Sequence, residues 1–383
     1  MTLIANNSSK FFIARTTDLL NNTSTDRSMW SEFYQHRVIV GVSLVDRLQK
    51  IEFPYGFKLY NEFEIPTDLN NFDLTYAQIC DKRASELLKH SDDTGLPIYL
   101  MYSGGIDSTA VLVAFLRQRE YSRLKDQLII LLNLDSIDEN PDFYYDHIRG
   151  KFKIESSEHI SYVFDGRGII IGGEHNDQVF GTDIVGKLLN LCTMEEIKKS
   201  YTSGIFKNWL LHKGMSEEAA DYWFRLIVWH AEQAPCEIKS TFDLFWWLNF
   251  SFKWQTVWFR LLLRIDSRYH KNLNPQWLDK HYKHFFTSTD FQKWSMLNPD
   301  KKINDTWSSY KFTAKDYIYD YTKDAFYRDN KDKRGSLYRL FIHKNTPIAI
   351  DENWNYIYDF DKEQYYQPSN SFSIDYKNVN LKS

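Results

Sequence analysis

The stretch IYLMYSGGIDSTAVL (residues 98–112) decides the fold, because it joins two apolar runs through glycines, hydroxyls and one carboxylate. The run before the glycines has the length of a buried strand, and STAVLVAFLRQREY (108–121) has the apolar spacing of a helix. Two glycines between them permit a tight turn and the close approach of a ligand to the backbone. The stretch therefore predicts a strand–turn–helix junction.

Segments of the same two kinds alternate on either side of this junction. Residues 74–91 have helical apolar spacing, residues 126–135 and 168–173 predict short apolar strands, and residues 143–152 predict a helix between those strands. Strands alternating with helices are typical of a parallel sheet covered on both faces. We therefore predict an α/β fold with a parallel sheet and helices on both faces.

The chain divides by composition into three parts. Residues 1–71 are β-rich, with strand-like segments at 37–45 and 56–65, residues 72–190 form the α/β core, and residues 191–383 are mostly helical. The most apolar window, 242–265, contains four charged side chains. A membrane span rarely has so many charges, so the window predicts one or two buried helices.

Charge and cysteine usage narrow the class of protein. With 47 basic and 51 acidic residues the net charge is -4, and there is no sequence signature of nucleic-acid binding. The three cysteines are far apart, which excludes a disulfide framework and makes a thiolate zinc site improbable. The N-terminus has no signal-peptide pattern, so we expect a cytoplasmic protein with no membrane partner.

The glycine junction has the chemistry of a phosphate site. Free N–H groups of the turn and the first helical turn favour an anion, and hydroxyls add further donors. Asp107 would repel phosphate unless a divalent cation such as Mg²⁺ lies between them. The junction residues predicted to cradle phosphate are Ser103, Gly104, Gly105, Ser108 and Thr109, with Asp107 on the cation.

SGGIDS (103–108) resembles the SGGxDS pyrophosphate loop of the N-type ATP pyrophosphatases, which include asparagine synthetase and β-lactam synthetase. A second segment, GEHNDQVFG (173–181), is similar to the GExxDExFGG-like segment of the asparagine synthetase branch. It matches at Gly173, Glu174, Asp177, Phe180 and Gly181, and it departs at Gln178 and Thr182. The resemblance implies an adenine nucleotide alpha hydrolase-like fold, with ATP and Mg²⁺ as cofactors. It also implies that Met101, Gly172 and Gly173 join the junction residues in holding the nucleotide.

The same resemblance implies roles for individual residues. Asp177 would join Asp107 around Mg²⁺, and Glu174 would serve the amine step or position the intermediate. The segment KDK (331–333) is similar to a late RxK segment whose lysine meets the pyrophosphate. Lys333 is the expected lysine, with Lys331 as the alternative.

The implied reaction is activation of a small-molecule carboxylate as an acyl-adenylate, followed by attack of ammonia or an amine to form an amide. No cysteine precedes Cys80, so the cysteine-dependent glutaminase domain of asparagine synthetases is not expected here. Free ammonia, an amine or a separate glutaminase would supply the nitrogen. The alternatives are adenylation of a nucleoside, a nucleic-acid base or a peptide, and a degenerate nucleotide-binding module.

Two further patterns are weaker. GTDIVGKL (181–188) nearly matches a P-loop. However, Leu188 cannot ligate Mg²⁺, and no apolar strand runs directly into Gly181. His281 and His284 have the i, i+3 spacing of a helical pair, for which structural histidines are the favoured interpretation over a metal site.

Overall fold

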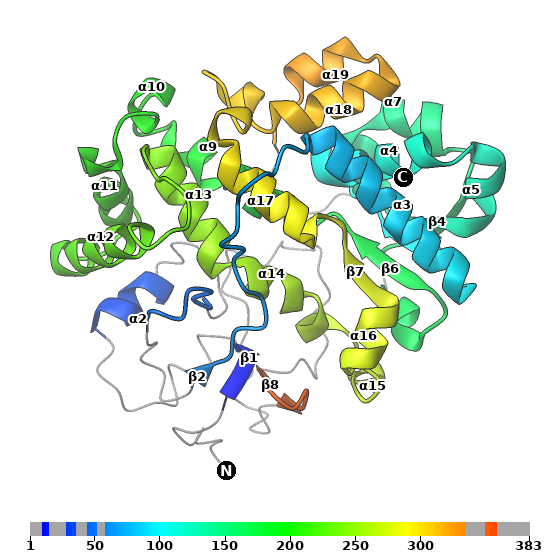
Figure 1. The fold of residues 1–383 in the computed structure, drawn as a ribbon, viewed down its shortest axis with the longest axis horizontal. Coiled ribbons are helices and arrows are strands. Elements are labelled where there is room, and N and C mark those ends of the chain that lie inside the picture. Colours follow the sequence, from blue (N-terminus) through cyan, green and yellow to red (C-terminus); the bar gives the residue numbers. More distant parts are fainter. Residues whose placement is uncertain are drawn as a thin grey trace, which may run out of the picture.

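The computed structural model describes residues 10–14, 28–35, 44–51, 58–158, 160–333 and 349–357 (Figure 1). Its centre is a five-stranded sheet in the order β5-β4-β3-β6-β7, in which every neighbouring pair is parallel. The strands are β3 (Ile98–Met101), β4 (Leu128–Leu132), β5 (Lys153–Ser156), β6 (Ile169–Gly172) and β7 (Tyr282–His284).

Both faces of this sheet are covered, because successive strand residues contribute to two separate cores. Ile98, Leu100 and Ile130 face the core that includes helices α3 (Tyr76–Thr94) and α4 (Ile106–Gln118). Tyr99 and Ile129 face the other core, which includes α14 (Trp254–Arg260) and α16 (Pro275–His281). The predicted fold class, an α/β protein with helices on both faces of a parallel sheet, is confirmed.

Three of the five strands are those expected from apolar runs, and two are not. β5 is polar and mostly exposed, and β7 lies in the region predicted to be helical. β7 pairs with β6 from Ile170↔Tyr282 to Gly172↔His284. The prediction that His281 and His284 share a helix is wrong, because His281 ends α16 and His284 lies on β7, where parallel pairing outweighs local helical spacing.

Helices make up most of the remaining described chain. In the first half they are α5 (Tyr121–Gln127), α6 (Leu134–Glu139), α7 (Pro141–Phe143), α8 (Asn176–Phe180) and α9 (Ile184–Leu188). In the second half they are α10 (Met194–Ile197), α11 (Ile205–His212), α12 (Glu217–Ala231), α13 (Thr241–Phe252), α15 (Ser267–His270), α17 (Thr289–Leu297), α18 (Phe312–Thr322) and α19 (Ala325–Asn330). The apolar window 242–265 was predicted to form one or two buried helices, and it contributes to two, α13 and α14.

Described segments from the N-terminal and C-terminal parts of the sequence meet in a second sheet, in the lower part of Figure 1. Its order is β2-β1-β8-β9, built from β1 (Lys10–Ala14), β2 (Lys58–Leu59), β8 (Ala349–Asp351) and β9 (Tyr356–Ile357), with α2 (Ser28–Gln35) nearby. Of the predicted strand-like segment 37–45, only residues 44 and 45 are described, and they are not in a strand.

Buried polar contacts join the N-terminal part to the helical part. Asp46 accepts hydrogen bonds from the backbone N–H groups of Leu48, Lys50 and Ile51, and its Oδ1 lies 2.7 Å from His230 Nε2 on α12. Arg47 donates to the carbonyl oxygens of residues 63, 64 and 250. Residues 44–51 are therefore an integral part of the fold.

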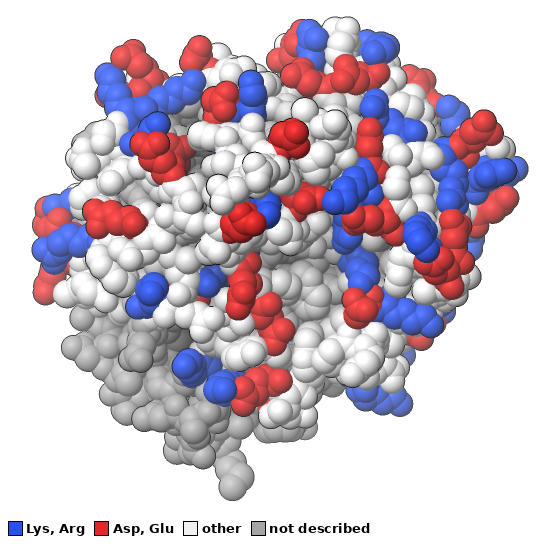
Figure 2. Space-filling view, in the orientation of Figure 1, with Lys and Arg blue, Asp and Glu red and all other residues white. Residues whose placement is uncertain are grey.

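The lengths of the helices and the distribution of surface charge both bear on which partners the protein could have. Of the helices in the described parts of the chain, none combines the length and the apolar character that a bilayer crossing requires. On the face in Figure 2, basic and acidic side chains are interspersed and no broad area carries a single sign.

Candidate active site at the carboxyl edge of the sheet

The glycine junction forms the predicted strand–turn–helix. β3 ends at Met101, Gly105 is the N-cap of α4, and no side chain caps that helix. Ser108 Oγ accepts a hydrogen bond from the Ser103 N–H at 3.1 Å and donates to the Gly105 carbonyl at 3.2 Å, which holds the turn closed. The first turn of α4 thus keeps its N–H dipoles directed at the carboxyl edge of the sheet, an arrangement suited to anions.

The turn requires glycine at residue 104. Its φ is +74°, and a Cβ there would lie 2.2 Å from the Ser136 carbonyl oxygen and 2.8 Å from Glu139 Cβ on α6. A side chain at residue 104 would therefore require both a strained backbone and displacement of α6.

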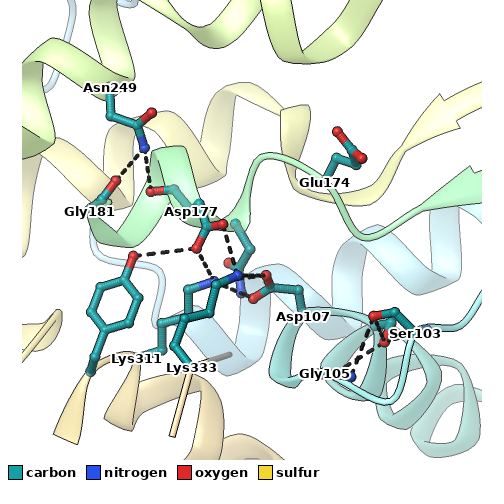
Figure 3. A network of polar contacts seen from close by, with 12 residues as sticks. Ser103, Gly105, Asp107, Glu174, Asp177, Gly181, Asn249, Lys311 and Lys333 are labelled. Carbon is teal, nitrogen blue, oxygen red and sulfur yellow. Dashed lines mark hydrogen bonds and ion pairs between the residues drawn. The ribbon is translucent and has the colours of Figure 1, made fainter. Parts of the chain in front are cut away.

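Four charged side chains meet beside this turn, and we call Asp107, Asp177, Lys311 and Lys333 the charge cluster (Figure 3). Lys311 Nζ lies 2.6 Å from Asp107 Oδ1 and 2.6 Å from Asp177 Oδ1. Lys333 Nζ lies 2.9 Å from Asp177 Oδ2 and 3.5 Å from Asp107 Oδ2. Each carboxylate thus contacts both ammonium groups, and the formal charges of the cluster cancel.

The cluster is assembled from distant parts of the chain. Asp107 lies in the first turn of α4 and Asp177 in α8, which follows β6 after a short loop. Lys311 is the N-cap of α18 in the left-handed region, with φ 62°, and its N–H donates to the Lys302 carbonyl at 2.8 Å. Lys333 follows α19. The lysines approach the carboxylates from the C-terminal part of the chain, as Figure 3 shows.

Burial sets the strength of these interactions. The Lys311 side chain is 0% exposed and that of Lys333 13% exposed. Burial acts to raise the pKa of Asp177, but Lys311 and Lys333 outweigh it and lower that pKa well below its usual range. Burial acts to lower the pKa of Lys333, and the carboxylates of Asp177 and Asp107 raise it instead. Asp177 therefore stays ionised and Lys333 stays protonated near neutral pH.

The donor set suits Mg²⁺. The carboxylates of Asp107 and Asp177 both contact the ammonium group of Lys311, so they are close enough to contact one metal cation. Mg²⁺ is commonly held by one or two carboxylates together with substrate phosphates. Within the described residues, no set of three His, Cys, Asp or Glu side chains forms a complete protein cage. Asp107 and Asp177 would hold the ion, and it would shield them from phosphate charge.

Glu174 lies apart from the cluster. Its side chain points away from the four charged groups in Figure 3, and its Oε2 accepts a hydrogen bond of 2.6 Å from Arg260 Nη2 at the end of α14. The Glu174 and Arg260 side chains are 31% and 17% exposed, close to the 30% of Asp177 and the 20% of Asp107, so the pair differs from the cluster mainly in lacking the cluster's more deeply buried lysines. Gly173 packs so tightly against the first turn of α4 that a Cβ would lie 3.2 Å from the Ser108 N–H nitrogen.

The structure separates the two candidate lysines of residues 331–333. Lys333 joins the cluster, whereas Lys331 Nζ pairs with the Glu139 carboxylate and lies 3.0 Å from the Glu139 backbone oxygen. Glu139 is on α6, the helix that supports Gly104. Lys331 therefore braces the outside of the turn and does not contact Asp107 or Asp177 through any recorded ion pair among the described residues.

The other predicted nucleotide ligands lie around the same edge with different exposure. Met101 is partly exposed at the end of β3, and Gly172 is buried beside His284. Thr109 is fully buried, and its hydroxyl lies beside those of Tyr102 and Tyr327. Thr109 thus faces the interior between helices and not the charge cluster.

Three residues at the site were absent from the sequence prediction: Lys311, Arg260 and Asn176. Lys311 is separated from Asp107 by 204 residues and Arg260 from Glu174 by 86, so no local pattern connects them. Asn176 lies within the matched segment and donates to Asp107 Oδ1 at 2.7 Å. Its position directly before Asp177 was the one available signal.

Comparisons with protein-family models, with curated proteins and with solved structures found no match. The geometry of the site and the chemistry of its side chains therefore carry the functional argument.

Proposed function

We propose that this protein is an ATP-dependent, amide-forming ligase. A carboxylate oxygen of the acceptor attacks the α-phosphorus of ATP, the bond from that phosphorus to the bridging oxygen breaks, and pyrophosphate leaves. Ammonia or an amine then attacks the acyl carbon, loses a proton, and releases AMP. The observation that carries the proposal is the meeting of Asp107 of SGGIDS with Asp177, Lys311 and Lys333 beside an uncapped helix N-terminus.

Each part of the site has a use in this reaction. The N-terminus of α4 suits the phosphates, and Asp107 and Asp177 suit Mg²⁺. Lys311 and Lys333 are fixed positive charges, which stabilise negative charge developing on the leaving pyrophosphate. The Glu174 carboxylate, 31% exposed at the same edge, suits the later step, in which a proton leaves the attacking nitrogen.

The cysteines support ammonia, an amine or a separate glutaminase as the nitrogen source. Glutamine hydrolysis by a cysteine requires an accessible thiol with a low pKa. Cys80 is buried, and burial raises the pKa of Cys80, of Cys192 and of Cys236, the last to about 11. None of the three has the environment of an activated nucleophile.

The test is product analysis. The purified chain is incubated with ATP, Mg²⁺, ammonium and a panel of free amino acids and other small carboxylates, and the nucleotides and phosphates are separated. AMP and pyrophosphate in equal amounts, dependent on one carboxylate, are expected. ADP and orthophosphate as the main products would overturn the proposal.

A further inference from the structure

Asn176 connects the two carboxylates of the charge cluster. It is fully buried at the start of α8, directly before Asp177, and its Nδ2 donates to Asp107 Oδ1 at 2.7 Å. Its Oδ1 accepts a hydrogen bond of 3.2 Å from the hydroxyl of Tyr76 on α3. A buried relay therefore runs from α3 through α8 to the carboxylate on α4.

Tyr76 determines which end of the Asn176 amide faces Asp107. A side-chain amide has a donor end and an acceptor end, and a phenol that donates to Oδ1 turns Nδ2 toward the carboxylate. Burial raises the pKa of Tyr76 well above its usual value, so the phenol keeps its proton. Its ring packs against Phe180 and Trp294, with centroid distances of 5.1 and 5.2 Å, which fixes the position of the hydroxyl.

Asn176 differs from the other partners of Asp107 in being neutral. Lys311 and Lys333 are cations, and an incoming pyrophosphate group competes with Asp107 and Asp177 for them. The amide has no such competitor, and it is too deeply buried to follow the ligand. Among the contacts of Asp107 in the described parts of the chain, the one from Asn176 is therefore suited to hold the carboxylate in place while the lysine contacts change.

We propose that Asn176 is a positioning residue: its amide, oriented by Tyr76, keeps the Asp107 carboxylate turned toward Asp177 so that the two can share one divalent cation. The inference rests on the proposed function, in which that cation accompanies ATP. A neutral donor on a carboxylate contributes more than an ordinary hydrogen bond, because the acceptor is charged.

The experiment measures cation binding without turnover. Mn²⁺ replaces Mg²⁺ as the probe, and its affinity in the presence of a non-hydrolysable ATP analogue is measured by electron paramagnetic resonance. Asn176→Ala should weaken Mn²⁺ binding by about tenfold, the expected loss for a hydrogen bond to a charged group. Tyr76→Phe keeps the ring packing and should weaken it by about threefold, because it removes only the orienting hydroxyl.

The double variant and a matched control separate positioning from damage to α8. Because Tyr76 acts through Asn176, the double variant should bind Mn²⁺ no more weakly than Asn176→Ala alone. Ser295→Ala is the control, since Ser295 donates to the Val179 carbonyl of α8 and touches no carboxylate. It should leave Mn²⁺ affinity unchanged.

Unchanged Mn²⁺ affinity in Tyr76→Phe or in a folded Asn176→Ala would overturn the inference, as would fully additive losses in the double variant. Catalytic assays give a second readout: Asn176→Ala should raise the Mg²⁺ concentration for half-maximal rate far more than it lowers kcat. The proposed function fails separately, through ADP as the product of the unaltered chain, and the Mn²⁺ result would stand in that case.

Discussion

The charge cluster and the Glu174–Arg260 pair lie at the same edge of the sheet but differ in how their charges are matched. The cluster joins two buried or nearly buried ammonium groups to two part-exposed carboxylates, and the four side chains come from separate positions in the chain. The pair holds one charge of each sign and is partly open to solvent. Removal of one carboxylate from the cluster leaves the fully buried Lys311 with a single counter-charge, whereas neither member of the Glu174–Arg260 pair is fully buried. We infer that the cluster is committed to one ligand, the nucleotide, and that the pair serves the variable acceptor and amine.

Asp107→Asn should have the largest effect. It leaves Lys311 and Lys333 facing Asp177 alone and removes one of two carboxylates available to Mg²⁺, so turnover should fall by more than about a hundredfold. Pyrophosphate exchange into ATP should fall equally, because both measure the first step. Full turnover in this variant would remove the cluster from the mechanism.

Lys333→Ala tests whether the cluster alone serves the nucleotide, with Lys331→Ala as the matched variant two residues away. Lys333→Ala should lower exchange and turnover by about a hundredfold, the usual loss for a cation at developing charge. Lys331→Ala should retain most activity and lower the melting temperature, since Glu139 loses its buried partner. The reverse result would assign pyrophosphate to Lys331.

Glu174→Gln tests the other half of the comparison. The variant should form the amide about a hundredfold more slowly, the usual loss for removal of a general base. Its rate of pyrophosphate exchange into ATP should stay within about tenfold of that of the unaltered protein. Arg260→Gln removes the other charge of the pair and should raise the KM of the acceptor without changing the KM of ATP. Equal losses in exchange and amide formation in Glu174→Gln would show that cluster and pair are one functional unit.

Lys302 gives the prediction with the smallest expected effect, because it is a buried lysine that forms no ion pair with a carboxylate of the described residues. It is fully buried, its Nζ lies 3.3 Å from the centre of the Trp246 ring, and burial lowers its pKa to about 7. Between pH 7 and its unfolded value near 10.5 the unfolded chain binds more protons, so stability rises with pH across that interval.

Lys302→Met should therefore raise the free energy of unfolding at pH 7 by about 1–3 kcal/mol, an effect that declines toward pH 10. Thermal melts across this pH range measure it. Destabilisation at pH 7 would show that the cation–π contact with Trp246 outweighs the cost of burial. Lys333, whose carboxylate partners raise its pKa, should show the opposite sign in the same substitution.

Sequence patterns were sufficient for the fold class and for the part of the site that follows strands β3 and β6. Apolar runs bounded by glycines predicted both strands. The segments SGGIDS and GEHNDQVFG, which follow these strands, predicted that Asp107 and Asp177 lie close together at one edge of the sheet. β7 was missed because only three residues form it, and its pairing with β6 is a tertiary effect. Lys311 and Arg260 were missed because packing, and no local periodicity, brings them to the edge.

The position of β7 has a consequence for synthesis. β6 has β3 on one side, and its other edge stays open until residue 282 emerges, 110 residues after Gly172. At ordinary elongation rates, that exposes an all-apolar strand edge on the nascent chain for on the order of 5–20 s. Open apolar edges invite pairing with other chains. We therefore expect a chaperone that shields strand edges to improve the yield of folded protein, and a translational pause between α8 and α16 to lower it.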